Sequence, residues 1–347
     1  MNKLIQAILD FFKRLFSADQ TNTKTKPQMD ETKPTQKKLY ALLVAIDKYR
    51  RPVPALRGCV NDRNALKAYL ERQFANQDDI QLNIKTLTDA EATKQGIIDA
   101  FGHFDDATPE DICLFYFSGH GSQAPSPQEF YHLDPDRRNE TLVCYDSRHE
   151  ARDLMDKELS YLIWKATNGK DQHFVTIFDC CHSGTMTRNA TMTARQAPAD
   201  SFPTRFQEYH GFQDYKISKE ENFAFASPPR GKSIQLAACK EQETAKETRI
   251  NGETRGIFTY NLVQTLEQSG GNVSYSELLQ ILQMRVGNKV RDQFPQLITT
   301  EPGDKNQRFL GGTIPPAPQS YLIQYSKGKW LMNAGTIQGI PPQGGTV

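Results

Sequence analysis

Residues 112–121 read ICLFYFSGHG, in which six apolar residues lead directly into a polar, glycine-flanked histidine, His120. A short apolar run rich in β-formers and bounded by glycine is typical of a buried strand. A second stretch of this kind, HFVTIFDCCHSG at 173–184, leads into a cysteine pair that includes Cys181. Each stretch therefore predicts a buried strand with reactive side chains at its carboxyl end.

The pattern around these two stretches predicts the fold class. Other apolar runs of strand length and stretches of helical spacing alternate with them: strands at 39–46, 80–87 and 233–239, and helices near 60–74, 93–104, 156–167 and 256–268. This alternation favours an α/β fold with a mostly parallel central sheet and helices on both faces. In such sheets the ligand site lies beyond the carboxyl ends of the strands, where His120 and Cys181 are expected.

Composition narrows the range of partners and compartments. The 347 residues carry 42 Lys and Arg against 41 Asp and Glu, so nothing in the net charge points to nucleic acid. The six cysteines follow no repeating spacing, which favours a reducing, cytoplasmic setting and argues against a zinc site. No apolar run reaches the ~18 residues of a membrane span, and the first 20 residues make a poor signal peptide.

The flanks of the α/β region have their own patterns. Residues 1–16 place apolar side chains at helical spacing and predict an amphipathic helix that docks on the protein itself, on a partner protein or on a membrane surface. Residues 17–37 are polar and contain proline, as expected of a flexible linker. The main domain is expected over 38–312, and 313–347 as a β-rich tail or the start of a further module.

A long stretch inside the main domain breaks the strand–helix alternation. Residues 185–232 hold four prolines and several basic residues, and a long loop within a domain is usually functional or disordered. This stretch is therefore a candidate for a functional or cleavable segment.

The residues at the two strand ends suggest thiol chemistry. A thiolate is a good nucleophile when a base lies nearby, and histidine is suited both to accept its proton and to protonate a leaving amine. Gly121 would leave its backbone N–H free to bind an oxyanion, with the N–H of Cys181 as a second donor. Taken alone, a buried cysteine is more often structural than catalytic.

Together these blocks resemble the metacaspases, the caspase-like cysteine peptidases that are called orthocaspases in prokaryotes. The resemblance covers about residues 38–312, and its anchors are LYALLVAIDKY (39–49), LRGCVND (56–62), LTDAEATKQGIIDAF (87–101), FYFSGHGSQ (115–123), IFDCCHSG (177–184) and RGIFTYNLVQTL (255–266). It implies a caspase-like sandwich and a thiol protease activity. It also implies a large-subunit-like part that ends near 184, a cleavable linker over 185–232 and a small-subunit-like part over 233–312. The family pattern makes His120 and Cys181 the catalytic dyad, with Cys180 at a variable position.

The same resemblance implies a specificity pocket. Its lining residues match Cys59, Asp62, Ser118 and Asp179. Two carboxylates in one pocket suit the side chain of arginine or lysine. From spacing alone, Asp62 could instead cap the helix that follows it.

Calcium-dependent relatives carry a cluster of aspartates, whose nearest counterparts here are Asp146 and Asp156. Lys157 and Arg188 stand where further oxygen ligands would be expected, and positive charges oppose cation binding. We therefore expect no required cofactor, and calcium dependence is disfavoured.

These observations favour a cysteine endopeptidase that cleaves protein or peptide substrates after Arg or Lys and is made as a self-processing zymogen. Arg188, Arg195 and Arg205 are the expected self-cleavage sites, because they lie in the proline-containing linker. The alternatives are a catalytically silent caspase-like scaffold or regulatory module, and an arginine-directed peptidase of another branch of the same clan. Five other histidines, at 132, 149, 173, 182 and 210, are interpreted as structural or solvated.

Overall fold

The computed structural model describes residues 36–75, 77, 79–167, 169–170, 172–181, 192–220, 223–312, 323–326 and 329–332. The expected helix over 1–16 and nearly all of the linker over 17–37 lie outside the described residues. Residues Gln36–Val347 form one compact unit.

The centre of this unit is a six-stranded sheet with the order β14-β11-β7-β3-β1-β2. Its strands are β1 (Lys37–Ala45), β2 (Ile80–Thr88), β3 (Ile112–Ser118), β7 (His173–Asp179), β11 (Ile234–Ala237) and β14 (Gln296–Thr299). All neighbours pair in parallel except β14, which runs antiparallel to β11 at one edge. The predicted mostly parallel sheet is confirmed, and each of the five expected strands is present.

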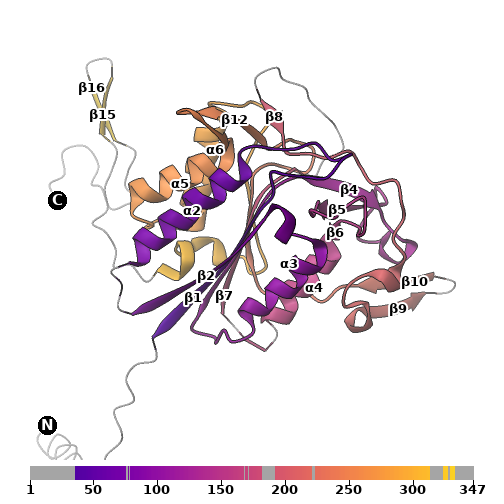
Figure 1. Cartoon of the computed structure of the whole chain (residues 1–347). Coiled ribbons are helices and arrows are strands. Elements are labelled where there is room, and N and C mark those ends of the chain that lie inside the picture. The colour runs from indigo at the N-terminus through magenta and orange to yellow at the C-terminus, as the bar shows by residue number, and fades with distance from the viewer. Residues whose placement is uncertain are drawn as a thin grey trace, which may run out of the picture. The chain divides into compact units, whose positions relative to one another are not determined.

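Helices cover both faces of the sheet, as Figure 1 shows. On one face lie α2 (Cys59–Phe74), α5 (Ile257–Ser269) and α6 (Tyr275–Gly287), and on the other α3 (Lys94–Ala100) and α4 (Asp156–Thr167). The alternation of side chains along the strands divides the core accordingly: Leu114 and Tyr116 pack with the first helix group, and Phe115 and Phe117 with the second. Helix α6 was not predicted from the sequence.

Smaller sheets and single turns surround this framework. The small sheets are β4 (Gly121–Pro125) with β5 (Arg138–Leu142) and β6 (Leu154–Met155), β8 (Thr193–Ala194) with β12 (Lys246–Ile250) and β13 (Glu253–Gly256), β9 (Lys216–Glu220) with β10 (Phe223–Ser227), and β15 (Ile323–Ser326) with β16 (Lys329–Met332). The 3₁₀ turns are η1 (Asp89–Glu91), η2 (Phe101–Phe104), η3 (Gln128–Phe130), η4 (Phe206–Glu208), η5 (Phe212–Asp214), η6 (Asp304–Asn306) and η7 (Phe309–Gly312).

The segment expected to be a loose linker is ordered where it is described. From 192 onward it forms β8, η4, η5, β9 and β10. Phe206, Tyr209 and Tyr215 pack against Phe130 and Tyr161 of the main domain, so the segment contributes to a small aromatic core. Its prolines and charges suggested a loop, but burial of these aromatic rings stabilises a fixed path.

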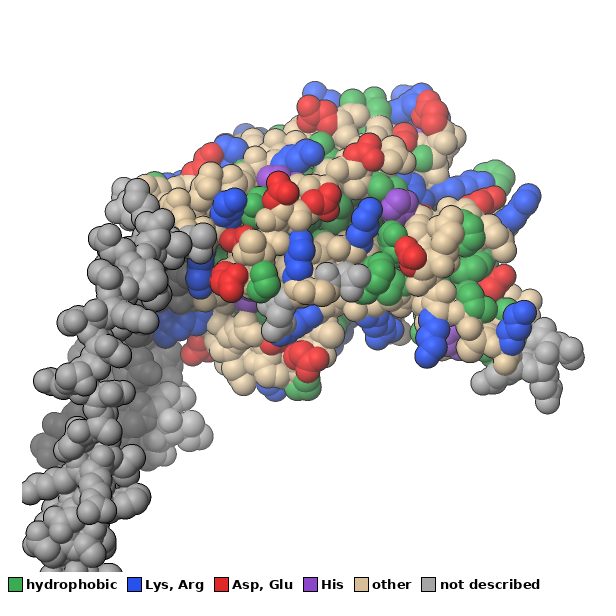
Figure 2. Space-filling view, turned by 90° about the horizontal axis from the view of Figure 1, so that it is seen from below, with side chains coloured by type: hydrophobic (Ala, Val, Ile, Leu, Met, Phe, Trp, Pro, Cys, Tyr) green, Lys and Arg blue, Asp and Glu red, His purple; other side chains and the backbone are tan. Residues whose placement is uncertain are grey.

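Figure 2 shows acidic and basic side chains interspersed over one face of the molecule, in keeping with the near-zero net charge. Among the described residues, no helix combines the length and the hydrophobicity that crossing a membrane requires.

Candidate active site

The register of the central sheet brings the two reactive strand ends together. In the pairing of β3 with β7, Ser118 lies opposite Asp179. His120 and Cys181 each follow two residues beyond that pair, at the carboxyl edge of adjacent parallel strands. Residues 61 positions apart in the sequence thus lie at one edge of the sheet, because both strands end there.

The protonation state of His120 follows from its hydrogen bonds. Its backbone N–H donates to the hydroxyl of Tyr49 (2.8 Å), and Nε2 lies 2.8 Å from the carbonyl oxygen of Pro54. Because a carbonyl only accepts, Nε2 carries the proton and Nδ1 is the basic nitrogen of the neutral ring. Nδ1 is buried and has no hydrogen-bond partner among the described residues. Burial lowers the pKa of His120 to about 4, so the ring is neutral at pH 7.

The Cys181 thiol is fully buried and is held by one backbone segment. Its sulfur accepts a hydrogen bond from the N–H of Ala245 (2.9 Å) and donates to the carbonyl of the same residue (3.3 Å). Interaction with this thiol, together with burial, raises the pKa of Cys239. Within the described chain these contacts do not include His120, so the thiol must rotate to reach the imidazole.

Cys180 points to the other side of the sheet. It belongs to the core beneath α3 and α4, whereas Cys181 belongs to the core beneath α2 and α5. Burial raises the pKa of the Cys180 thiol well above its ordinary value. Of the two cysteines, only Cys181 lies on the side of the sheet where the chain around Arg195 runs.

A backbone carbonyl already occupies the expected oxyanion position. The carbonyl oxygen of Arg195 accepts hydrogen bonds from the N–H groups of Gly121 (3.1 Å) and Cys181 (3.2 Å). A Cβ atom on residue 121 would lie 1.5 Å from the carbonyl oxygen of Cys181, so only glycine fits there. Two donors converge on one carbonyl oxygen, which is the geometry that stabilises a tetrahedral oxyanion.

The side chain of Arg195 fills a closed acidic pocket. One guanidinium nitrogen, Nη1, lies 2.9 Å from both the Asp179 carboxylate and the Ser118 hydroxyl. The other, Nη2, lies 2.6 Å from the Asp62 carboxylate and 3.4 Å from that of Glu247. The side chain is fully buried. Three of the four residues expected to line the pocket therefore contact this guanidinium directly.

The fourth expected residue, Cys59, is buried at the start of α2. Burial raises the pKa of its thiol, and the positive charge of Arg195 opposes that rise. Cys59 thus lies within electrostatic range of the same guanidinium without a hydrogen bond to it in the described structure.

Backbone and side-chain donors support the two aspartates. Asp62 accepts from the N–H of Gly256 (2.7 Å) and from Nε of Arg255 (2.7 Å). Asp179 accepts from the N–H (3.1 Å) and the hydroxyl (2.6 Å) of Thr259. Burial raises the pKa of Asp62 to about 6, with Arg195 acting in the opposite direction.

Helix α2 is capped by a different residue from the one considered in the sequence. The carboxylate of Asp47 accepts from the N–H groups of Cys59 (2.8 Å) and Val60 (3.2 Å). Asp62 itself makes no capping bond and points into the pocket. Capping is therefore done by Asp47, and the alternative role of Asp62 is wrong.

Several residues of this site carry no signal in the sequence. Glu247 and Ala245 lie in or beside the small sheet of β12 and β13, which comes between the central strands β11 and β14 in the chain. Only the RGIFTYNLVQTL block pointed to Arg255, Gly256 and Thr259, and it gave them no role. Glu247 reaches the pocket because the β12–β13 hairpin packs on α2. No local sequence pattern predicts this packing.

The chain on either side of Arg195 lies across the site as an extended segment. Before it, β8 pairs antiparallel with β12, and the N–H of Arg195 donates to the carbonyl of Ala245 (2.9 Å). After it, Gln196 forms a bridge with Gly121, and the N–H of Ala197 donates to the carbonyl of Gly121 (3.0 Å). The segment thus uses the backbone contacts that a bound peptide would use.

The other expected self-cleavage sites differ from Arg195. The side chain of Arg205 is 84% exposed and pairs with Glu208, away from the acidic pocket. Arg188 and His182 lie outside the described residues.

The two weak metal candidates each have other partners. Asp146 accepts from the N–H of Lys94 (2.8 Å) at the start of α3. Asp156 pairs with Lys157 (2.8 Å), whose ammonium group also contacts Asp134. Burial raises the pKa of Asp156 to about 6.

Another acidic group lies beside the pocket. Potential ligand atoms of Asp47, Cys59 and Glu247 lie within 4.8 Å of one another. Their oxygens, however, already accept from backbone N–H groups at the start of α2, including Arg57 (3.0 Å) and Gly58 (3.1 Å) for Glu247. We therefore interpret this group as capping the helix.

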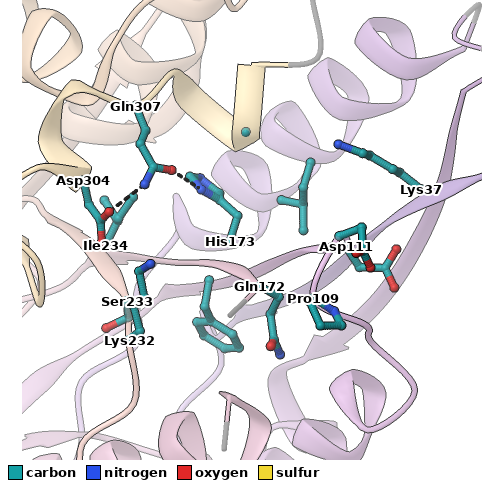
Figure 3. A pocket seen from close by; sticks show the side chains of 14 residues that line it. Lys37, Pro109, Asp111, Gln172, His173, Lys232, Ser233, Ile234, Asp304 and Gln307 are labelled. Atoms are coloured by element: carbon teal, nitrogen blue, oxygen red, sulfur yellow. Dashed lines mark hydrogen bonds between the residues drawn. The ribbon is translucent and has the colours of Figure 1, made fainter. Parts of the chain in front are cut away.

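A separate cavity of about 230 Å³ lies at the amino ends of the central strands (Figure 3). His173 reaches into it from the start of β7, with Nδ1 on Gln307 (2.8 Å) and Nε2 on Tyr275 (2.7 Å). Asp179 ends the same strand, ~20 Å away at the rise of a parallel strand. Both ring nitrogens of His173 thus have partners within the fold, and this cavity lies at the opposite end of the strand from His120 and Cys181.

A sheet-edge histidine, a cysteine and two convergent N–H donors are the groups that cysteine hydrolases of the α/β class use. The model of the caspase domain, peptidase family C14, matches residues 38–307, and the chain belongs to this family of cysteine peptidases. The chain is 26% identical to metacaspase-1 of Candida albicans and of Schizosaccharomyces pombe, over 78% of its own length and 66% and 69% of theirs. It is also 26% identical to metacaspase-1B of Aspergillus terreus, over 77% of that protein.

The fold has a counterpart among solved structures. A Geobacter sulfurreducens protein of known crystal structure matches with a TM-score of 0.53 and 18% identity, over 78% of this chain and 97% of that one. This likeness concerns the fold alone.

Proposed function

We propose that this protein is an endopeptidase that cleaves proteins and peptides after arginine, using Cys181 as nucleophile and His120 as base. The observation that carries the proposal is the placement of Arg195. Its side chain lies among three carboxylates, and its carbonyl oxygen lies between two N–H donors beside Cys181. A scaffold with no catalytic role would not need both features on one residue.

In the proposed reaction, the Cys181 thiol leaves Ala245 and transfers its proton to Nδ1 of His120. The thiolate sulfur then bonds to the carbonyl carbon of the arginine, and the oxyanion is held by the N–H groups of Gly121 and Cys181. The C–N bond breaks as His120 returns the proton to the leaving amine. Water, deprotonated by His120, next attacks the thioester, which releases the arginine carboxylate and restores the thiol.

The pocket favours arginine over lysine. Each terminal guanidinium nitrogen has its own carboxylate, Asp179 for Nη1 and Asp62 for Nη2. An ammonium group offers one centre of charge and cannot meet both carboxylates in this divided arrangement. Lysine substrates should therefore be cleaved more slowly than arginine substrates.

Self-processing is proposed at the bond between Arg195 and Gln196. Of the two expected sites that are described, only Arg195 lies in the pocket. Until this bond is broken and the segment leaves, Arg195 excludes the arginine of any other substrate, which makes the intact chain a zymogen. Cleavage at Arg188 and Arg205 is proposed to be secondary.

Activity without calcium is supported by the Lys157 ammonium group. It lies between Asp134 and Asp156, where it neutralises carboxylates that would otherwise attract a cation. No cofactor enters the proposed mechanism. Action in the cytoplasm, and attachment of residues 1–16 to a partner protein or a membrane surface, remain predictions.

The test is a set of fluorogenic peptides that differ only in the residue before the cleaved bond. Wild type should cleave Arg peptides fastest, Lys peptides more slowly and Asp peptides not at all, because a further negative charge would meet the carboxylates of Asp62, Asp179 and Glu247. Cys180→Ala should retain most of the activity, and Cys181→Ala should have none. A wild-type protein that neither processes itself nor cleaves any of these peptides would favour the silent scaffold instead.

A further inference from the structure

The acidic pocket accounts for the residue before the cleaved bond, but the chain after that bond is held just as specifically. The chain after the bond is hydrogen-bonded to the edge of β4 that does not face β5. The N–H of Asp200 donates to the carbonyl of Gln123 (2.7 Å), and the hydroxyl of Ser122 donates to the carbonyl of Pro198 (2.9 Å). Because β4 is paired only with β5 within its sheet, its other edge is open to an added strand.

These contacts divide the segment into generic and specific parts. The bonds to β4 involve backbone groups that any peptide presents. The side chains of Pro198 and Ala199 are exposed, so the enzyme does not select the residue type at these two positions. Asp200, by contrast, turns its side chain inward and is nearly fully buried, with 3% exposure.

The partner of Asp200 is Arg148. One terminal nitrogen of its guanidinium, Nη1, lies 2.9 Å from the Asp200 carboxylate. The other, Nη2, donates to the carbonyl of Pro198 (3.0 Å) and to the Ser122 hydroxyl (3.0 Å). Arg152 adds a second positive charge, 3.8 Å from the same carboxylate.

Arg148 is held in place by the enzyme itself, independently of the segment. Nη1 of Arg148 also lies 2.9 Å from the fully buried carboxylate of Asp153, which accepts a hydrogen bond from the hydroxyl of Thr141 (2.7 Å). Asp153 can therefore keep the guanidinium in position after the segment departs. A guanidinium with one fixed carboxylate and a second charged neighbour, Arg152, retains a net positive charge for the next occupant.

We propose that Arg148 forms a substrate subsite for an acidic residue at the fifth position after the cleaved bond. The inference rests on the proposed function and extends it to a substrate class: proteins in which an arginine is followed, after four further residues, by aspartate. In this chain the sequence is Arg-Gln-Ala-Pro-Ala-Asp at 195–200. The subsite also accounts for the choice of Arg195 for self-cleavage, because Arg205 is followed five positions later by His210.

The space around the subsite suits a protein substrate. A cavity of about 640 Å³ adjoins it, bounded by residues 52–53 and 148–152 on one side and 198–202 on the other. Larger side chains than Pro198 and Ala199 would fit at the third and fourth positions after the cleaved bond. The acidic residue beyond them then fixes the register of the bound strand.

The test uses processed wild-type enzyme and internally quenched peptides based on residues 192–203. One peptide carries the natural Asp at the position of Asp200, the second carries Asn, and the third has Asn there and Asp in place of Ala199. The first should be cleaved about tenfold more efficiently, in kcat/KM, than either of the others, and this advantage should shrink at high salt. The third peptide controls for net charge.

A variant enzyme completes the test. In Arg148→Gln, the ratio between the Asp and Asn peptides should fall to about one, whatever the variant does to the overall rate. Equal cleavage of the Asp and Asn peptides by wild type would overturn the subsite. A short Arg substrate with no residues after the dye separates this failure from that of the proposed function: if it is cleaved, the peptidase stands and only the subsite falls.

Discussion

Removal of the Arg195 guanidinium should destabilise the unprocessed protein by a large and measurable amount. Arg195→Gln, made in the Cys181→Ala background so that the chain stays intact, leaves three buried carboxylates with one fewer partner. Arg255 still pairs with Asp62, but Asp179 and Glu247 lose the only ion pair that each makes among the described residues. Breaking a buried ion pair by removing one partner costs about 3–5 kcal/mol.

The pH dependence of this loss has a definite sign. The pKa of Asp62 is already raised to about 6 by burial, and Arg195 opposes that rise. Without Arg195 the folded protein binds a proton at Asp62 more readily than the unfolded chain does, so its stability increases as the pH falls. The difference between Arg195→Gln and its parent should therefore be larger at pH 8 than at pH 5.

The assay is urea unfolding of both proteins, with Arg205→Gln in the same background as a matched control. Arg205 lies in the same segment, and its exposed side chain should contribute no more than ~0.5 kcal/mol. If Arg195→Gln unfolds at the same urea concentration as Arg205→Gln, the guanidinium does not lie in a closed acidic pocket and the reasoning is refuted.

Three further predictions concern the active enzyme. The KM for arginine peptides should rise as the pH falls below about 6, because Asp62 becomes protonated and loses its charge; a flat KM from pH 7.5 to pH 5 would contradict this assignment. Glu247→Gln should raise the KM for arginine peptides about five- to tenfold while changing kcat little, since it removes one of three charges from the pocket; an unchanged KM would exclude Glu247 from substrate binding. Activity should be the same in excess chelator and in millimolar calcium, because Lys157 neutralises Asp134 and Asp156; a strong and reversible calcium requirement would show that a cation site exists elsewhere.

The sequence predicted the framework of this site because that part depends on strong local patterns. Two apolar runs of strand length ended in reactive residues, and parallel strands align their carboxyl ends. His120 and Cys181 therefore had to lie at one edge. The pairing of Ser118 with Asp179 agrees with these two strands, but the pocket itself was expected only from the resemblance to the metacaspases.

The remainder depends on long-range contacts that no local pattern reports. Glu247 reaches the pocket because the β12–β13 hairpin packs against α2, nearly 190 residues earlier in the chain. Arg148 carries no motif, and its role appears only when Asp200 is placed beside it. The choice of Arg195 among three candidate arginines likewise required the path of the segment, whose aromatic residues stabilise it against the main domain.

The most direct test of the peptidase assignment is the bond at which the chain cuts itself. Purified wild type and Cys181→Ala are incubated in parallel, and the fragments are identified by intact-mass measurement and N-terminal sequencing. We predict that wild type yields a fragment that begins at Gln196 and that Cys181→Ala stays whole. The same fragment in Cys181→Ala, or a wild-type chain that stays intact at this bond while arginine peptides go uncleaved, would contradict the account.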